Sequence, residues 1–238
     1  MGAPDISAVI PVYNDRGSLE TAIPRSMEVL AGLDPGFELI IAEDGSRDGS
    51  TELVRGWEAR DPRVRLLHSD IRLGRGKALT RAFCEARGSI VCYYDVDMAT
   101  DISHLPELIG SIRDGFDVAT GSRLLPGSSI IRSGGREVAS RGYNFLVRAF
   151  LHSSLFDHQC GFKAFRKDRI LTLLLTVRDT HWFWDTEILV RAQRAGYRIR
   201  EFPVRWTEGR GTTVRRNDVL TMGRSILRLW WQLHVEKG

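Results

Sequence analysis

Two carboxylates separated by one residue end an apolar and aromatic stretch of the chain. The segment VCYYDVDMAT, residues 91–100, contains this run and stops at Asp95 and Asp97. A continuous apolar run is typical of a strand buried on both faces, and in open α/β sheets ligands bind just beyond the carboxyl ends of such strands. Side chains two residues apart on an extended segment point the same way, so both can hold one hard cation such as Mg²⁺ or Mn²⁺. The pattern therefore predicts a metal site that binds a diphosphate.

Acidic residues after a strand also form turns and cap helices, so a D-x-D triplet alone does not establish a site. The positions of the other polar residues decide between the two interpretations. Asp15, Asp44 and Arg123 each follow an apolar segment, as Asp95 and Asp97 do. In a parallel sheet all these positions lie at one edge, and this convergence favours a ligand site over a series of unrelated turns.

The elements that must position these residues are apolar segments that alternate with helical patterns. The expected strands cover residues 6–12, 37–42, 64–68, 90–94 and 117–120. Ser18 and Ser50 are expected to cap the first two helices, and Pro24 to kink the first. Because such alternation produces right-handed βαβ units, the sequence predicts an α/β fold with a mostly parallel sheet flanked by helices.

The second half of the chain is less regular. A long basic, amphipathic helical region is expected over residues 130–156, and a second amphipathic helix over residues 218–235, with arginines on one face and leucine and tryptophan on the other. The segments expected between them are a strand at 161–166, a helix at 171–176, a helix that opens within 181–187 and ends at Gly196, and a strand at 198–204.

The composition is that of a soluble globular protein with a preference for arginine. Only four of its 34 basic residues are lysines, and the net charge is +4. Arginine suits phosphate ligands, although a GC-rich coding sequence explains the same preference equally well. The three cysteines have no C-x-x-C spacing, which favours a reduced, cytosolic compartment. No apolar run approaches the roughly 20 residues of a membrane span, so we expect no transmembrane segment.

Several common motifs are absent. The sequence Gly74-Arg75-Gly76-Lys77 lacks the spacing of a phosphate-binding P-loop, and the third glycine of a dinucleotide fingerprint is Leu79 here. No zinc-finger or RNA-binding signature is found, so no nucleic-acid partner is expected.

The ordered motifs resemble those of the family-2 glycosyltransferases of GT-A (Rossmann-like) fold. Within that family the chain is most similar to the polyprenyl-phosphate sugar synthases, and closest to the dolichyl-phosphate β-glucosyltransferases. The motifs are IPVYND at 10–15, EDGSRDGS at 43–50, DVDMAT at 95–100, GSR at 121–123, R-x-x-x-S-R-G at 136–142, DHQCGFKAF at 157–165 and WFWDTE at 182–187. The resemblance covers nearly the whole chain. It implies one GT-A domain over residues 1–215, with a nucleotide-sugar-binding half at 1–125 and an acceptor half at 126–215, followed by an amphipathic helix at 216–238.

The resemblance also implies roles for individual residues. Asp97 is expected to be the main metal ligand, and Asp95 to face the ribose or the metal. The residues expected to line the nucleotide pocket are Pro11, Tyr13, Asp15 and Asp44. The residues expected to hold the phosphate of a lipid acceptor are Arg123, Arg136 and Arg141. The cluster expected around the sugar is Trp184, Asp185 and Glu187 with the QCGFK segment, which favours the glucosyl over the mannosyl branch.

Two positions depart from the family pattern. Asp15 stands where relatives usually have glutamate, which shortens the side chain by one carbon. Ala99 stands where the mannosyl enzymes tend to have glutamine, so water is expected in place of a third side-chain ligand.

The expected reaction moves a hexose, glucose or mannose, from a nucleotide diphosphate sugar to a polyprenyl or dolichyl phosphate with inversion. A divalent ion on Asp97 would stabilise the diphosphate leaving group, and Lys77 or Arg75 would add positive charge. The lipid phosphate oxygen is already anionic and needs positioning more than deprotonation. A saccharide hydroxyl, the alternative acceptor, would need a general base, for which Asp185 is the candidate. A non-catalytic nucleotide-sugar-binding or scaffold subunit is a third hypothesis, against which the intact acidic edge argues.

The expected partners follow from this reaction. They are UDP-glucose or GDP-mannose, a polyprenyl or dolichyl phosphate, and the membrane surface that holds the lipid. Arginine-rich amphipathic segments can lie in a membrane interface, with Trp230 and Trp231 as anchors. A cytoplasmic protein peripherally attached to the cytoplasmic face of a membrane is therefore expected. The alternative is that the last helix packs on the core or on a partner subunit.

Overall fold

The fold alternates strands and helices through its first half. A computed structural model describes residues 4–131, 134–209 and 216–235, without the side chains of residues 134, 136 and 216–220. The strands are β1 (Ile6–Val12), β2 (Glu38–Glu43), β3 (Val64–Leu67), β4 (Ile90–Tyr94), β5 (Val118–Ser122), β6 (Ser129–Ile131), β7 (Phe162–Arg166), β8 (Ile199–Pro203) and β9 (Arg205–Thr207). The helices are α1 (Arg16–Ala31), α2 (Ser50–Glu58), α3 (Arg75–Glu85), α4 (Leu105–Arg113), α5 (Gly134–Leu151), α6 (Lys167–Leu174), α7 (Trp184–Arg194) and α8 (Arg216–His234), with a 3₁₀ turn η1 (Ile102–His104) before α4.

The described strands form a seven-stranded sheet in the order β3-β2-β1-β4-β7-β5-β8, with β6 and β9 as a separate parallel pair. All neighbours in the large sheet are parallel except β7, which runs antiparallel to β4 and β5. Strands β1, β2, β4 and β5 are buried along their whole length, as their continuous apolar runs predict. The predicted mostly parallel α/β fold is confirmed.

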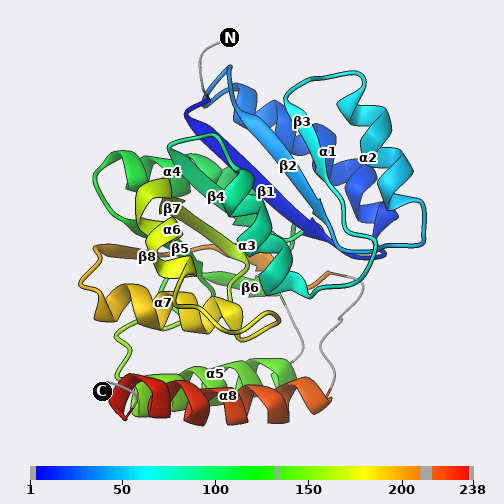
Figure 1. The fold of residues 1–238 in the computed structure, drawn as a ribbon. Coiled ribbons are helices and arrows are strands. Elements are labelled where there is room, and N and C mark those ends of the chain that lie inside the picture. Colours follow the sequence, from blue (N-terminus) through cyan, green and yellow to red (C-terminus); the bar gives the residue numbers. More distant parts are fainter. Residues whose placement is uncertain (1–3, 132–133, 210–215, 236–238) are drawn as a thin grey trace.

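Helices cover both faces of the sheet (Figure 1). One hydrophobic cluster joins the sheet to α1, α2 and α4, and a second joins its other face to α3, α6 and α7. A third cluster packs α5 and α8 together and against residues of the α7 region, including Phe183 and Val190. The α5–α8 pair therefore forms a layer beside the main sheet, below it in Figure 1.

Local details correct several sequence predictions. Asp15, not Ser18, is the N-cap of α1, and its side chain accepts a hydrogen bond from the Ser18 N–H. Gly49, whose φ is +88°, precedes α2 in place of the predicted cap Ser50. Residues 129–131 form strand β6, so the long helix begins at residue 134 and not at 130. Strand β9 was not predicted, because three residues are too few to show a periodic pattern.

The described helices give no candidate for a membrane span: none of them is both long enough and apolar enough.

Candidate functional site

The carboxyl ends of the parallel strands bring the predicted acidic residues to one rim of the sheet. Asp15 and Asp44 follow β1 and β2, and Asp95 and Asp97 follow β4. The loops after β1 and β2 are joined at Asn14, whose N–H donates to Ser46 Oγ and whose Oδ1 accepts from the Arg47 N–H. The expected convergence of these segments on one rim is therefore present.

Two residues at this rim hold unusual backbone conformations. Asn14 and Met98 both have a φ of +50°, in the left-handed region that residues other than glycine rarely adopt. Backbone strain of this kind persists only where the surrounding structure enforces it, and it concentrates at functional sites. Met98 directly follows Asp97, so the strained turn fixes the direction of that carboxylate.

Glycine backbones pack directly against both carboxylates of the D-x-D triplet. The Asp95 N–H donates to the Gly161 carbonyl at 3.2 Å, and a Cβ added to Gly161 would lie 1.9 Å from Asp95 Oδ2. A Cβ added to Gly209 would lie 2.7 Å from Asp97 Oδ2. The segments before β7 and after β9 therefore close around the two aspartates.

Asp97 is exposed at the rim, but its charge is poorly compensated. The Ala99 N–H donates to its Oδ1 at 3.0 Å. Partial desolvation by the surrounding loops raises the pKa of Asp97, and the negative charges of Asp95 and Asp15 raise it further. Because the neighbouring charges of Asp95 and Asp15 are also negative, the position of Asp97 is favourable for a cation.

Asp95 and Asp97 are also the residues that fit a divalent metal. Within the described residues no group of three or more His, Cys, Asp or Glu side chains is arranged to hold a metal ion. Two carboxylates instead suit a hard cation that keeps water and substrate phosphates as its remaining ligands, as Mg²⁺ usually does. The donor set therefore fits a cation shared with a diphosphate and not an all-protein cage.

Arg75 joins the rim to the interior of the protein. Its Nε and Nη2 lie 3.2 and 2.7 Å from Asp95 Oδ1, and its Nη1 lies 2.5 Å from Asp185 Oδ2. The guanidinium carbon is 5.3 Å from the ring centroid of Tyr93 and 5.7 Å from that of Trp182. Burial opposes its charge, but Asp185 and Asp95 hold the pKa of Arg75 well above its usual value.

Asp185 is buried and surrounded by donors. The hydroxyl of Tyr93 donates to its Oδ1, and Lys163 Nζ lies 3.1 Å from the same oxygen. Burial would raise the pKa of Asp185, but the charges of Arg75 and Lys163 outweigh burial and lower it. Lys163 is itself inaccessible to solvent and donates to the Cys160 carbonyl at 2.5 Å.

The residues expected at the nucleotide lie at the ends of β1 and β2. Pro11 is buried in β1 opposite Ala42 of β2. The buried carboxylate of Asp44 accepts the N–H groups of Leu73 and Gly74 at 2.7 and 2.9 Å, so it organises the loop before α3.

Tyr13 and Lys77 differ in their surroundings. The guanidinium carbon of the exposed Arg72 lies 3.9 Å from the ring centroid of the half-buried Tyr13, which forms an aromatic and cationic pair beside the rim. Lys77 is exposed on α3, whereas Arg75, the first residue of the same helix, reaches Asp95. Of the two basic residues that the sequence offered, Arg75 is therefore the one in contact with the D-x-D triplet.

Arg123 is held by a buried partner that the sequence did not indicate. Its Nε and Nη2 lie 2.7 and 2.9 Å from Asp157 Oδ2 and Oδ1, in a bidentate pair. Burial acts against the charge of Asp157, but Arg123 holds its pKa well below the usual range. The same guanidinium lies 5.6 Å from the centroid of Trp206. Arg123 is thus fixed in place before any ligand binds.

The two other arginines expected at the acceptor phosphate belong to α5, and Glu187, expected near the sugar, lies in α7. Arg141 is exposed on α5 and pairs with Glu137 at 2.7 Å. Arg136 belongs to α5, but its side chain is outside the described residues. Glu187 is buried; it accepts the N–H groups of residues 178 and 179 and pairs with Arg191 at 2.7 Å.

The sequence placed Lys163 around the sugar as the last residue of QCGFK, gave Asp157 no role, and gave Arg75 only as an option. These residues find partners 20 to 110 positions away along the chain. The available signal was a lone lysine inside an otherwise apolar strand segment, FKAF, because a buried lysine requires an anionic partner.

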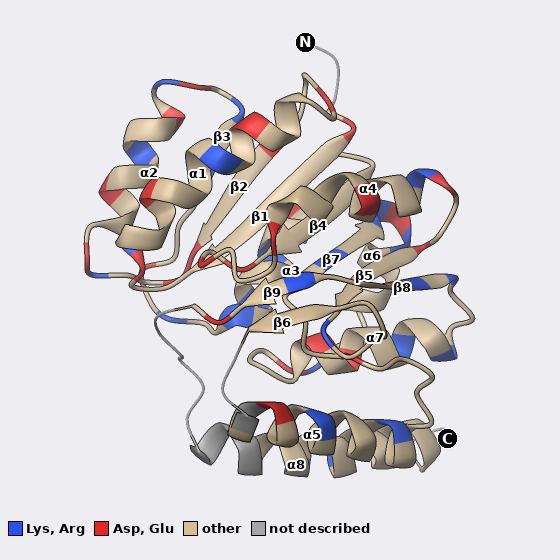
Figure 2. Ribbon diagram, turned by 180° about the vertical axis from the view of Figure 1, so that it is seen from behind, with Lys and Arg blue, Asp and Glu red and all other residues tan. Residues whose placement is uncertain are grey.

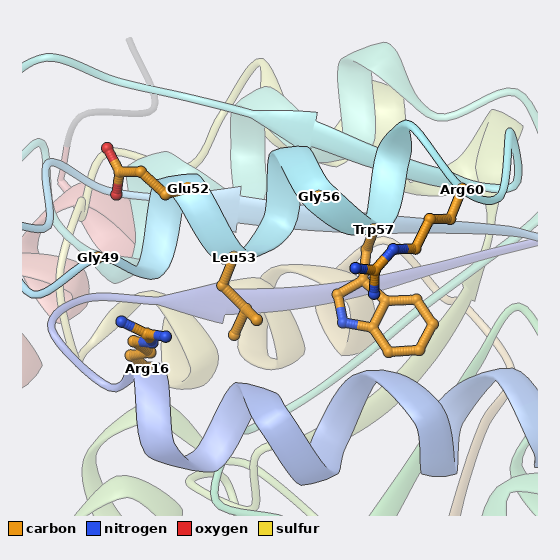
Figure 3. A pocket seen from close by; sticks show the side chains of 7 residues that line it. All are labelled: Arg16, Gly49, Glu52, Leu53, Gly56, Trp57 and Arg60. Atoms are coloured by element: carbon orange, nitrogen blue, oxygen red, sulfur yellow. The ribbon is translucent and has the colours of Figure 1, made fainter.

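A separate hollow lies between α1 and α2 (Figure 3). Its volume is about 280 Å³, and Arg16, Trp57 and Arg60 are among its lining residues. None of the predicted site residues lines it. The candidate site is therefore the acidic rim and not this hollow.

Comparisons with known proteins give a family match and several similar proteins. The profile of the family described as Glycosyl transferase family 2 matches residues 7–172. Glycosyltransferase AglD of Haloferax volcanii is 51% identical over 97% of this chain, which spans only 38% of the length of that relative. Dolichyl-phosphate beta-glucosyltransferases of Drosophila melanogaster and Saccharomyces cerevisiae are 27% and 29% identical over 95% and 87% of this chain, and the matches cover 74% and 68% of those proteins.

A solved structure has the same fold. Glucosyl-3-phosphoglycerate synthase from Mycobacterium tuberculosis, in complex with Mn²⁺, UDP and glucosyl-3-phosphoglycerate, aligns with a TM-score of 0.68 and 19% identity. The alignment covers 96% of this chain and 79% of that protein. At this identity the likeness shows the shared fold.

Proposed function

Because this chain belongs to glycosyl transferase family 2, we propose that it transfers a hexose from a nucleotide diphosphate sugar to a polyprenyl phosphate such as dolichyl phosphate. The observation that carries the proposal is the pair Asp95 and Asp97 on the rim with Asp15 and Asp44. Several relatives named dolichyl-phosphate beta-glucosyltransferase support the lipid acceptor and favour glucose as the sugar.

The donor site is proposed at the ends of β1, β2 and β4. Asp97, with Asp95 beside it, would hold Mg²⁺ or Mn²⁺, which supplies Lewis-acid stabilisation of the departing diphosphate when bound. Arg75 places a second positive charge against Asp95, at 2.7 Å. Tyr13 and the loop organised by Asp44 are proposed to contact the nucleoside, as UDP-glucose or GDP-mannose.

The state of Asp185 supports a phosphate acceptor over a saccharide hydroxyl. Both of its oxygens already accept hydrogen bonds, and its pKa is lowered, which opposes a role as general base. An anionic lipid phosphate oxygen needs no base. It would attack the anomeric carbon opposite the diphosphate, forming one C–O bond as the other breaks, so an α-linked donor gives a β-linked product. Arg123, with Arg136 and Arg141, is proposed to hold the acceptor phosphate.

The α5–α8 layer is proposed to lie on the membrane that contains the acceptor. Figure 2 shows that charge on this layer is sparse and mostly basic where it is described. Its exposed apolar side chains are Val138, Phe145, Leu146 and Phe150 on α5 and Leu227, Trp230 and Trp231 on α8. Clustered exposed apolar residues with flanking arginines are typical of an interfacial helix. We propose peripheral attachment at the cytoplasmic face.

The proposal is tested by transfer of radiolabelled sugar. The purified chain is incubated with labelled UDP-glucose or GDP-mannose, Mn²⁺ and a polyprenyl phosphate, and the product is extracted into organic solvent. We expect label in the organic phase from one of the donors, and none when a chelator replaces Mn²⁺. Label that moves only to a water-soluble saccharide would favour the hydroxyl-acceptor alternative, with Asp185 as base.

A further inference from the structure

A row of four charged side chains runs from the rim into the core, in the order Asp95, Arg75, Asp185 and Lys163. Each neighbouring pair is in contact, at 2.7, 2.5 and 3.1 Å. The side-chain exposure falls along the row from 41% at Asp95 to 13%, 5% and 0% at Lys163. The charges alternate in sign, and Asp95 is the most exposed member of the row.

Such a row of buried charges contributes little net stability to a fold. Burying ions costs several kcal/mol each, and apolar replacements of a buried ion pair are often as stable. The row therefore calls for an explanation at its exposed end. There both Nε and Nη2 of Arg75 point at one oxygen of Asp95, while the other oxygen faces the Gly161 backbone. The orientation of the Asp95 carboxylate depends on where Arg75 lies.

The inner half of the row fixes that position. Asp185 anchors Arg75 through Nη1, and Asp185 is in turn held by Lys163 and by the Tyr93 hydroxyl. Lys163 is tied to the backbone at the Cys160 carbonyl. Lys163 belongs to strand β7 and Asp185 to helix α7, so these two elements fix the Arg75 guanidinium on the side away from Asp95.

We propose that Asp185 and Lys163 are positioning residues for the metal–diphosphate site. They hold the Arg75 guanidinium against Asp95, so that a cation and a diphosphate meet a preoriented carboxylate and a fixed positive charge. This inference rests on the proposed donor site. It gives Asp185 a role in donor binding through Arg75, and none in deprotonating the acceptor.

The test is calorimetric binding of UDP, and in parallel GDP, in the presence of Mn²⁺. We expect Asp185→Asn and Lys163→Met each to weaken nucleotide binding about ten- to hundredfold, as residues that orient metal ligands typically do. In an Arg75→Gln background, Asp185→Asn should add no further loss, because its effect acts through Arg75. Tyr93→Phe, which removes one neutral donor from Asp185, should have a smaller effect of the same sign.

Glu38→Gln is the matched control. Glu38 is an equally buried carboxylate that pairs with Arg65 at 2.6 Å and accepts from Ser7 at 2.5 Å. It lies at the start of β2, at the opposite edge of the sheet from the rim. Its loss should lower the melting temperature, as we also expect for Asp185→Asn, and should leave the nucleotide Kd unchanged.

Three results are decisive. A wild-type chain that binds neither nucleotide with Mn²⁺ overturns the proposed donor site and this inference with it. In the second result, the wild type binds nucleotide, and Asp185→Asn binds it equally well but no longer turns over. That result overturns this inference alone and supports Asp185 as a general base. The inference is also overturned if the double variant loses nucleotide affinity by the product of the two single losses, from Asp185→Asn and Arg75→Gln.

Discussion

Asp95 and Asp97 have the same side chain but different electrostatic surroundings. Arg75 compensates Asp95 at 2.7 Å, whereas the charges near Asp97 that affect it most are negative. Desolvation and those negative charges raise the pKa of Asp97, so its ionised form is less favourable in the folded chain than in the unfolded one. We therefore propose that a bound cation would stabilise the ionised form of Asp97 more than that of Asp95.

We predict opposite effects on stability and activity for Asp97→Asn. Because the pKa of Asp97 is raised on folding, its ionised form destabilises the folded chain, so without metal the variant should melt at a higher temperature than the wild type at neutral pH. Transfer should fall about thousandfold, since metal stabilisation of the leaving group contributes several kcal/mol and each 1.36 kcal/mol is tenfold. Melting curves and the transfer assay measure both.

Asp101→Asn is the control for this prediction. Hydrogen bonds from the Ser103 backbone and side chain and from Arg205, with the Arg205 charge, outweigh burial and lower the pKa of Asp101 to about 2. Removing that carboxylate should lower the melting temperature at neutral pH. A drop for Asp97→Asn as well would contradict the electrostatic account of the rim.

The two acidic positions and Asp44 could be predicted from sequence because each directly follows an apolar strand. The ion-pair partners of Arg75, Lys163 and Asp157 could not be predicted, because they depend on which distant residue lies opposite each of them in the fold. Asp185 was assigned to the sugar from its motif, and its three donors became visible only with the packing of α7 against β4 and β7.

The direction of strand β7 determines which residues from the second half of the chain reach the rim. Because β7 runs antiparallel between β4 and β5, the segment before it, residues 157–161, arrives at the same edge that the parallel strands reach at their ends. This brings Asp157 to Arg123 and Gly161 to Asp95. The apolar pattern of residues 161–166 predicted a strand but carries no information on its direction.

We predict that Gly161→Ala disrupts the site more than the fold. The new Cβ would lie 1.9 Å from Asp95 Oδ2, so the carboxylate must turn away from Arg75. Mn²⁺-dependent UDP binding should weaken at least about tenfold, as for a lost orienting contact. Gly142→Ala on α5, where a Cβ meets nothing within 4 Å, is the matched control and should bind normally. Equal binding by both variants would contradict the assigned contact.

The same segment predicts a pH dependence of stability. Burial lowers the pKa of His158 to about 3, and its ring nitrogens contact Asn144 Oδ1 and Ser153 Oγ at 2.8 and 2.7 Å. The unfolded chain takes up this proton near pH 6.5, so the contribution to stability is complete above that pH and is lost as pH falls towards 3.

At pH 5 the free energy of unfolding should be about 2 kcal/mol lower than above pH 6.5. The difference between an unfolded-state pKa of about 6.5 and pH 5 is about 1.5 units, and each unit contributes about 1.36 kcal/mol. Urea denaturation between pH 5 and 8 measures it, and His158→Gln should flatten the profile over that range. An unchanged slope in the variant would mean that another group causes the pH dependence. Asp157 is no competitor, because its lowered pKa places its own contribution at more acidic pH.

In the whole molecule, the acidic rim belongs to the main sheet, and the α5–α8 pair forms a layer of its own beside that sheet (Figure 1). The amphipathic patterns predicted both helices, and the third hydrophobic cluster accounts for one side of each. The sequence could not tell whether the last helix packs on the protein or on a membrane. The structure shows α8 packed on α5, while Leu227, Trp230 and Trp231 remain exposed.

We predict that the exposed side of this layer binds lipid. The double variant Phe145→Glu with Trp231→Glu, at side chains that are 69% and 55% exposed, should lose flotation with liposomes by at least about tenfold. Burial of one large apolar side chain is worth about 1.5–3 kcal/mol, which supports a loss of that size. Leu175→Glu, at an exposed leucine after α6, is the control and should float as the wild type does. Equal recovery of all three proteins would discard the membrane surface.

Asp95 and Asp97 are proposed to share a divalent cation with the diphosphate of the donor. A crystal of the chain grown with Mn²⁺ and UDP, measured at the manganese absorption edge, tests it most directly. We expect one strong anomalous peak at coordination distance from Asp97, beside Asp95, with the diphosphate as a further ligand. Bound UDP with the manganese peak elsewhere, or with no peak at this rim, would contradict the account.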